Sequence, residues 1–202
     1  MAFIDPVERA AFGALWRRLG LWGAVWVGLA VRRRVKRGEP FAGWTDAEDA
    51  KEAGSRAQLG PAVALYRELQ ARGRTDAREV VAEAVHDGAL AFLGATVGPI
   101  RRADLEAMDD AGRRTWLEAV GDRFPNATVR WEQTGPDAVR FRVTSCRFVA
   151  LCRALDVPEL APVFCAGDAT FFGSVEPNVT LTRPTTLAEG GDHCLFTLEW
   201  RD

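Results

Sequence analysis

The chain has 202 residues, enough for one domain with its own core or for one domain with a helical appendage. Its composition is that of an ordinary globular protein, with 48% hydrophobic residues, 27% charged residues and a net charge of −2. This near-neutral balance gives no general case for nucleic-acid binding. Arginine supplies nearly all the positive charge, since Lys36 and Lys51 are the only lysines, a bias typical of a GC-rich bacterial genome.

The amino terminus, residues 1–9, lacks the basic-then-apolar order of a secretion signal. Without an export signal, the cysteines are expected to be reduced thiols rather than disulfides. The sequence therefore predicts a cytoplasmic protein. The cysteines are Cys146, Cys152, Cys165 and Cys194.

Residues 6–36 are predicted to be helical, with a possible break near Gly20. Apolar residues recur there at spacings of three and four and form one broad face. The apolar run at 19–31 is too short to span a bilayer, and the basic run 32–37 follows it. The segment fits either an interfacial helix on an anionic membrane or a buried helix whose basic end complements its dipole. We favour the buried helix, so membrane association is not expected, while a homodimer through the N-terminal helices stays open. The face comprises Trp16, Leu19, Trp22, Val25, Trp26 and Leu29.

Further helices are predicted before residue 125. Thr45 and Asp46 form a plausible helix N-cap, and a helix over 60–72 places Pro61 in its first turn. A second helix opens at 75–79 with a cap-then-glutamate spacing and stops before Gly98. A third covers 103–124.

The pattern then changes to the alternation of strands, at 128–133, 138–143, 179–183 and 193–200. Short helices are predicted at 146–155 and from 157 through Asp168. In the last strand, Cys194 alternates with apolar residues on the face assigned to the core. The prediction is an α+β fold, with a helical N-terminal half packed on a four-stranded antiparallel sheet with inserted helices. We expect a single domain over 1–202, mainly helical over 1–124, with the sheet and the cysteines in 125–202.

Several potentially reactive side chains fall in this C-terminal part. Cys165 and Asp168 are three residues apart on a predicted helix and therefore share a face. Cys194, pointing inward from a strand, and Cys146, at the end of another, could join them. His193 is out of register with Cys194 and would face the other side of the strand.

Three chemistries are open for these cysteines. A thiolate could be a nucleophile, with Asp168 or His193 as base or orienting group. Thiolates with Asp168 or His193 could hold zinc, although no Cys-x-x-Cys is present. The cysteines could also be inert core residues, which is the role expected for Cys152. Phosphate-binding loops, a nucleophile elbow, His-Glu-x-x-His and a dinucleotide fingerprint are all absent from the sequence.

Four segments together resemble a known family. They are 143–146, 155–160, Phe164-Cys165-Ala166-Gly167-Asp168 and 179–196. In this order they resemble the C-terminal half of the L-2-amino-thiazoline-4-carboxylic acid hydrolase family, over about residues 141–197. Leu195 departs from the family pattern, since an acidic residue often follows the last cysteine there. The recurrent positions are Cys146, Cys165, Asp168, Thr186, Gly190 and Cys194.

The resemblance implies a hydrolase of a C–N bond that opens a small cyclic amidine-like ring, with a carbamoyl-cysteine product in the named member. It implies that Cys165 attacks or positions water and that Asp168 transfers protons. The expected catalytic residues are Cys165, Asp168 and Cys194, and the expected substrate-binding residues are Cys146, Arg183, Thr186 and His193.

The expected partner is a small-molecule substrate and not a nucleic acid, and no cofactor is expected, although zinc or another metal on the cysteines stays possible. Two other functions remain open. One is a metal-binding or redox enzyme of a biosynthetic pathway that uses the same thiols. The other is a non-catalytic small-ligand module, similar to sensor domains of the 4-vinyl reductase type.

Overall fold

The computed structural model describes residues 5–201, and its helices and strands form an α+β fold, as predicted. The helical elements of the N-terminal half are α1 (Pro6–Lys36), α2 (Ala50–Ala71), α3 (Ala77–Phe92), the π-helical turn η1 (Leu93–Val97), α4 (Arg102–Glu106) and α5 (Asp110–Asp122). The C-terminal elements are β1 (Ala127–Thr134), β2 (Ala138–Cys146), α6 (Arg147–Ala154), η2 (Pro158–Leu160), α7 (Ala161–Gly173), β3 (Val179–Thr182), η3 (Leu187–Glu189) and β4 (Cys194–Trp200).

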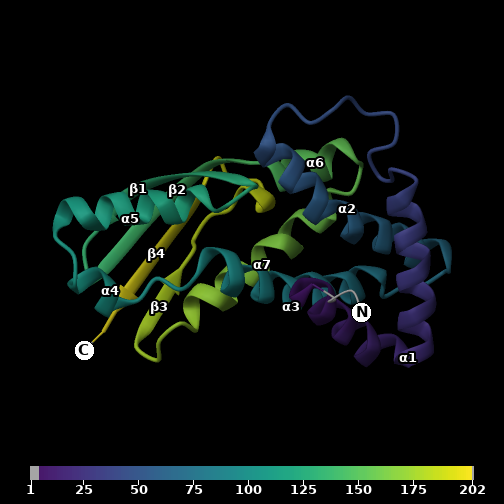
Figure 1. The fold of residues 1–202 in the computed structure, drawn as a ribbon, viewed down its shortest axis with the longest axis horizontal. Helices are drawn as coiled ribbons and strands as arrows, with labels where there is room; N and C mark the ends of the chain where they lie inside the picture. Colours follow the sequence, from purple (N-terminus) through teal and green to yellow (C-terminus); the bar gives the residue numbers. More distant parts are fainter. Residues whose placement is uncertain (1–4, 202) are drawn as a thin grey trace.

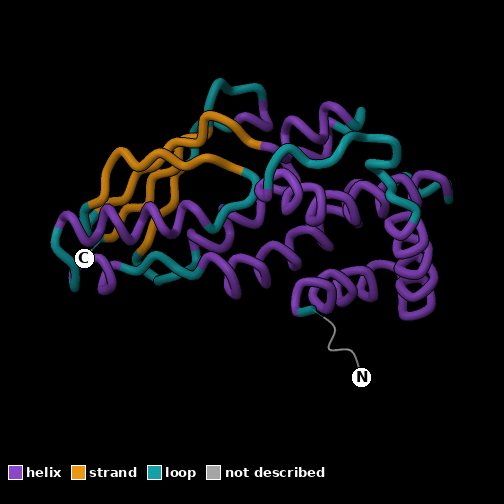
Figure 2. Tube along the Cα trace, turned by 45° about the horizontal axis from the view of Figure 1, so that its top comes forward, coloured by secondary structure: helices purple, strands orange, loops and turns teal. Residues whose placement is uncertain are grey.

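The four strands form one antiparallel sheet in the order β1-β2-β4-β3, so the two central strands are β2 and β4. The register pairs Val143 with Cys194 and Phe141 with Phe196, whose rings stack at 4.7 Å. α5 packs on β1. The sheet lies at one end of the molecule and α1 at the other (Figures 1 and 2). The predicted four-stranded sheet is confirmed.

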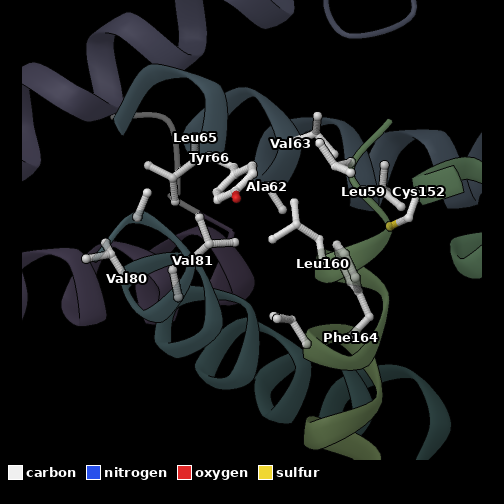
Figure 3. Close-up of a cluster of buried hydrophobic side chains, with 14 of the residues drawn as sticks. Leu59, Ala62, Val63, Leu65, Tyr66, Val80, Val81, Cys152, Leu160 and Phe164 are labelled. Carbon is white, nitrogen blue, oxygen red and sulfur yellow. The ribbon is translucent and has the colours of Figure 1, made fainter. Parts of the chain in front are cut away.

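Two hydrophobic cores lie along this long axis, and α7 contributes to both. The helical core includes Leu160 of η2 and Phe164 of α7 together with buried residues of α1, α2, α3 and α6 (Figure 3). The sheet core includes Phe172 near the end of α7. α7 and α3 pack so closely that a Cβ on Gly167 would lie only 2.5 Å from the Cβ of Ala89. α7 is therefore fixed between the helices and the sheet.

The helix predicted over 60–72 begins earlier in the structure than the sequence indicates. α2 begins at Ala50, after Asp49, whose carboxylate accepts the backbone N–H of Glu52 at 2.7 Å. Pro61 lies inside the helix instead of in its first turn. A proline there removes one backbone hydrogen bond, but both neighbours on the chain, Gly60 and Ala62, are buried. Tertiary packing of this face outweighs the local helix-breaking tendency.

The helix predicted over 103–124 is interrupted. α4 ends at Glu106 and α5 begins at Asp110, because Asp109 leaves the helical conformation and its carboxylate accepts the N–H of Gly112 at 2.8 Å. A side-chain cap of this kind competes with helix continuation. The helical periodicity of apolar residues over 103–124 does not reveal this break between α4 and α5.

The break in the first helix is confirmed, but the burial of its apolar face is not. Gly20 has φ 70° and ψ 168°, a conformation open to glycine and strained for other residues. The side that packs inward carries small residues, among them Ala24 and Val27. Three tryptophans are exposed instead, with 55% (Trp16), 74% (Trp22) and 59% (Trp26) of their surface accessible.

One helical stretch of the described chain, Ala77–Glu106, is long and apolar enough by length and composition to cross a membrane. It includes α3, which packs against α1, α2 and α7. Core helices of globular proteins meet the same criterion.

Candidate functional site

A cavity of about 40 Å³ lies between α7 and the inner face of the sheet. Four of the predicted site residues line it, namely Cys146, Cys165, Asp168 and Cys194. The remaining wall is largely aromatic and comes from the sheet, α6, α7 and the segment before β1. Its phenylalanines are Phe124, Phe141, Phe148, Phe164, Phe172 and Phe196.

Helix and strand periodicity bring the four polar residues together. Cys165 and Asp168 face the cavity from one side of α7, as the spacing of three predicted. Cys194 opens β4 opposite Val143 of β2, and Cys146 ends β2 three residues further on. Both strands therefore present a thiol to the cavity that Cys165 and Asp168 of α7 also line.

The Cys165 thiol is held in its neutral form. Its sulfur lies 3.7 Å from the carbonyl oxygen of Ala161, to which the thiol donates. Burial raises the pKa of Cys165 to about 12, and the negative charge of Asp168 acts in the same direction. A free thiolate is therefore not present at neutral pH, and attack by this sulfur requires a base.

Cys194 is also held as a thiol, because burial raises its pKa. The backbone N–H of Leu187 donates to its sulfur at 3.2 Å, which opposes that shift. Only 6% of the residue is exposed. The contact ties the connection between β3 and β4 to the cavity wall.

Asp168 is the group of the cavity best suited to proton transfer. Burial raises the pKa of its carboxyl to about 7, and the positive charge of Arg183 acts in the opposite direction. Within residues 5–201, its carboxyl oxygens have no hydrogen-bond or ion-pair partner. Both protonation states are therefore populated near neutral pH, as general acid–base catalysis requires.

Arg183 supports α7 from outside the cavity. Its guanidinium donates to the carbonyl oxygen of Cys165 at 2.7 Å and lies 5.5 Å from the centre of the Phe196 ring. It does not belong to the lining residues. In this position Arg183 holds the part of α7 that carries Cys165 and Asp168, and it does not make the predicted contact with a substrate in the cavity.

Two other predicted substrate-binding residues do not line the cavity. The Thr186 hydroxyl donates to the Glu189 carboxylate at 2.6 Å and accepts its backbone N–H at 3.2 Å, which caps η3. His193 pairs with the carboxylate of Asp192. As strand parity suggested, His193 is not among the lining residues that include Cys194. In this structure both residues shape the β3–β4 connection rather than the cavity.

The aromatic wall and Asn126 are the part of the site that the sequence did not reveal. Asn126 lies just before β1, and its side-chain amide donates to the sulfur of Cys146 at 3.7 Å. Phe124 and Phe172 are far apart in the chain, and their rings lie 6.3 Å from each other. The apolar periodicity of each helix or strand identifies these phenylalanines as core residues. Nothing in the sequence indicates that their rings surround a cavity.

Cys152 lies outside the cavity, as predicted. It is fully buried among apolar side chains such as Leu59 and Leu160 (Figure 3), and burial raises its pKa to about 12. Its role is packing.

A metal site finds no support in the donor geometry. In the part of the chain that the structure describes, no group of three or more histidine, cysteine, aspartate or glutamate residues could hold a metal ion.

The fold and the cavity define a class, a small α+β protein with a cavity lined by thiols and a carboxyl group. Residues 54–198 match the profile of the family described as L-2-amino-thiazoline-4-carboxylic acid hydrolase. The chain belongs to this family. No curated protein matches it.

Solved structures of H-NOX proteins are similar over the whole length. The NMR structure of the SO2144 H-NOX domain from Shewanella oneidensis in the Fe(II)CO ligation state has 11% identity and a TM-score of 0.43, and the alignment covers 98% of this chain and 99% of that one. A crystal structure of an H-NOX protein from S. oneidensis in the Fe(II)NO ligation state has 14% identity and a TM-score of 0.42, with 98% and 100% covered. Similarity at this level carries no inference about a ligand here.

The raised pKa of Asp168 predicts a pH-dependent stability. The folded protein binds this proton more tightly than the unfolded chain, whose carboxyl has the ordinary value of 3.8. The stabilisation is complete below about pH 4 and is lost as the pH rises through about 7. Asp168→Asn removes the ionisable group, so the variant should gain about 2–4 kcal/mol over wild type between these limits. Urea unfolding at about pH 4 and pH 8 measures the change, and an equal difference at both pH values would refute it.

Proposed function

We propose that the protein is a hydrolase that opens a small cyclic amidine-like ring of the thiazoline type. The observation that supports this most directly is the carboxyl of Asp168, which has no hydrogen-bond or ion-pair partner within residues 5–201 and lines the same cavity as the Cys165 thiol. The family match adds the substrate class, because the family is named for a thiazoline carboxylic acid. General acid–base chemistry near neutral pH needs a group with the pKa of this carboxyl.

The first step is attack by sulfur. The Asp168 carboxylate takes the proton of the Cys165 thiol, and the sulfur bonds to the ring carbon between nitrogen and sulfur. When the intermediate collapses, the bond from this carbon to the ring sulfur breaks. The ring sulfur leaves with the proton from Asp168, and the opened substrate stays on Cys165 as an isothiourea.

The second step is hydrolysis. Water loses a proton to Asp168 and attacks the same carbon, the bond to Cys165 breaks, and the thiol regains its proton. One water is consumed in total, and the product carries a carbamoyl group and a new thiol. Because a carbamoyl group keeps both nitrogens on that carbon, a carbon–sulfur bond breaks, not the C–N bond inferred from the family resemblance.

The aromatic wall sets the conditions for this chemistry. Low polarity keeps Asp168 protonated up to about pH 7 and strengthens electrostatic interactions in the site. The cavity of about 40 Å³ holds about one water, however, and ligand sites usually measure about 300–1,000 Å³. A thiazoline ring can enter only if part of the wall moves. Phe148 and Phe164, whose rings lie 4.9 Å apart, join α6 and α7 along this wall.

The direct test is release of a thiol from 2-amino-thiazoline-4-carboxylate by the purified protein, followed with a thiol-reactive dye. We expect one thiol per ring consumed, with no loss of rate after treatment with a metal chelator. Absence of thiol release from this compound and from analogues without the carboxylate would contradict the proposal.

A non-catalytic small-ligand module is the second candidate. It is favoured by the largely apolar wall of the cavity, a lining typical of sites that bind small ligands. Such a module would bind the same compounds in calorimetry while leaving their rings intact over many hours. Saturable binding without thiol release would therefore replace the first proposal with this one.

A further inference from the structure

The exposed face of α1 combines large apolar side chains with unpaired positive charge. Trp22, Val25, Trp26 and Leu29 follow the spacing that puts residues on one side of a helix, and Trp22, Trp26 and Leu29 are 74%, 59% and 41% exposed. The opposite side carries Ala24 and Val27, which are buried. A soluble monomer rarely leaves neighbouring tryptophans in water without a partner.

The same face continues into a basic end. Arg33 and Lys36 follow Leu29 at spacings of four and seven residues, so they extend the stripe through the last turns of α1, and Arg37 lies beside them. All three are exposed. Within the described chain, their side chains have no ion-pair partner, whereas neighbouring Arg34 is bound by Glu39 and Glu68.

Positive charge is concentrated in this segment. Between Arg9 and Gly38 lie eight of the 26 basic residues of the chain and none of the 28 acidic ones. The rest of the chain has 18 basic and 28 acidic residues, a net charge of −10. Arg17, Arg18, Arg32 and Arg34 are ion-paired with acidic residues outside this segment. The unpaired positive charge therefore lies mainly at the basic end of α1, and this helix is at the end of the molecule opposite the sheet (Figures 1 and 2).

We propose that the outer face of α1 binds the surface of an anionic lipid membrane. Tryptophan and leucine enter the boundary between headgroups and acyl chains, where aromatic residues are favoured. Arg33, Lys36 and Arg37 contact the negatively charged headgroups. The burial that we expected for this helix from its sequence is supplied by lipid instead of by the protein.

The charge pattern favours lipid over two other occupants. A second copy that used the same face of α1 would bring two sets of unpaired basic residues together, and like charges oppose such a contact. A nucleic acid offers phosphates to the arginines, but it has no apolar layer to cover Leu21 and Leu29 beside the tryptophans. An anionic bilayer supplies both.

Vesicle sedimentation tests this proposal. The full chain should bind vesicles of equal parts phosphatidylglycerol and phosphatidylcholine, bind vesicles of phosphatidylcholine alone far more weakly, and be released by salt. The triple variant Arg33→Gln, Lys36→Gln, Arg37→Gln should bind the anionic vesicles about a hundredfold more weakly. The matched control removes three exposed arginines elsewhere, as Arg114→Gln, Arg130→Gln, Arg153→Gln, and should bind like wild type.

A second variant tests the apolar part. Trp22→Ser with Trp26→Ser should weaken vesicle binding at least about tenfold while the circular dichroism spectrum stays unchanged, because both side chains are exposed. Equal binding to both vesicle types, or to neither, would overturn the proposal. So would a dimer that this variant dissociates, or binding to a single-stranded oligonucleotide, if anionic vesicles are not bound.

Discussion

Asp168→Asn should reduce the rate of thiol release by about 10²–10⁴-fold, the range that positioned general acid–base groups contribute. The substitution keeps the size of the side chain and removes its ability to take a proton from Cys165. The loss should appear in kcat, since the proton moves during the chemical step. Steady-state kinetics of thiol release measures it.

The matched control for this substitution is Asp46→Asn, which removes an exposed carboxyl that does not line the cavity. It should leave turnover unchanged. The structural expectation for Asp168→Asn is a folded and, above neutral pH, more stable protein, so lost activity cannot be attributed to unfolding. Turnover within threefold of wild type for Asp168→Asn would exclude Asp168 as the proton-transfer group.

Cys165→Ser should reduce turnover at least about a hundredfold, because a hydroxyl is a much weaker nucleophile than a thiol in the same position. The wild-type protein, quenched with acid during turnover, should carry one substrate mass on the peptide that contains Cys165. The variant should show no such adduct. Mass spectrometry of the digested protein makes both measurements.

Cys152→Ser is the control for this second substitution. It makes the same chemical change in the helical core outside the cavity, so it should lower stability and leave the turnover of the folded protein intact. Unchanged turnover of Cys165→Ser, with no adduct on wild type, would show that water attacks the ring directly and that Cys165 only lines the site.

How well the site can be predicted from the sequence depends on how many residues separate its members along the chain. Spacing along one helix placed Cys165 and Asp168 together, and strand parity separated His193 from Cys194, because both patterns are local. In contrast, the placement of α7 next to the strands that carry Cys146 and Cys194 follows only from the predicted fold and not from a local pattern. The role of Thr186 as a cap also has a local signal, the Thr-x-x-Glu spacing that ends at Glu189.

Long-range packing explains the larger errors. α2 continues through Pro61 because the flanking residues are buried, which no local signal shows. α1 turns its small residues inward and its tryptophans outward, since α3 packs against the flatter side. The hydrophobic pattern identified an amphipathic helix but could not say which apolar side faces the core, because the opposite side is apolar as well.

The pH dependence of kcat/KM for thiol release tests the central claim most directly, since it reports the pKa of the essential group in the free enzyme. With Asp168 as the base, the rate should fall about tenfold per pH unit below a midpoint near 7, the pKa that burial gives this carboxyl. A midpoint near pH 4, the ordinary value for an aspartate, or a rate independent of pH between these limits would contradict the account.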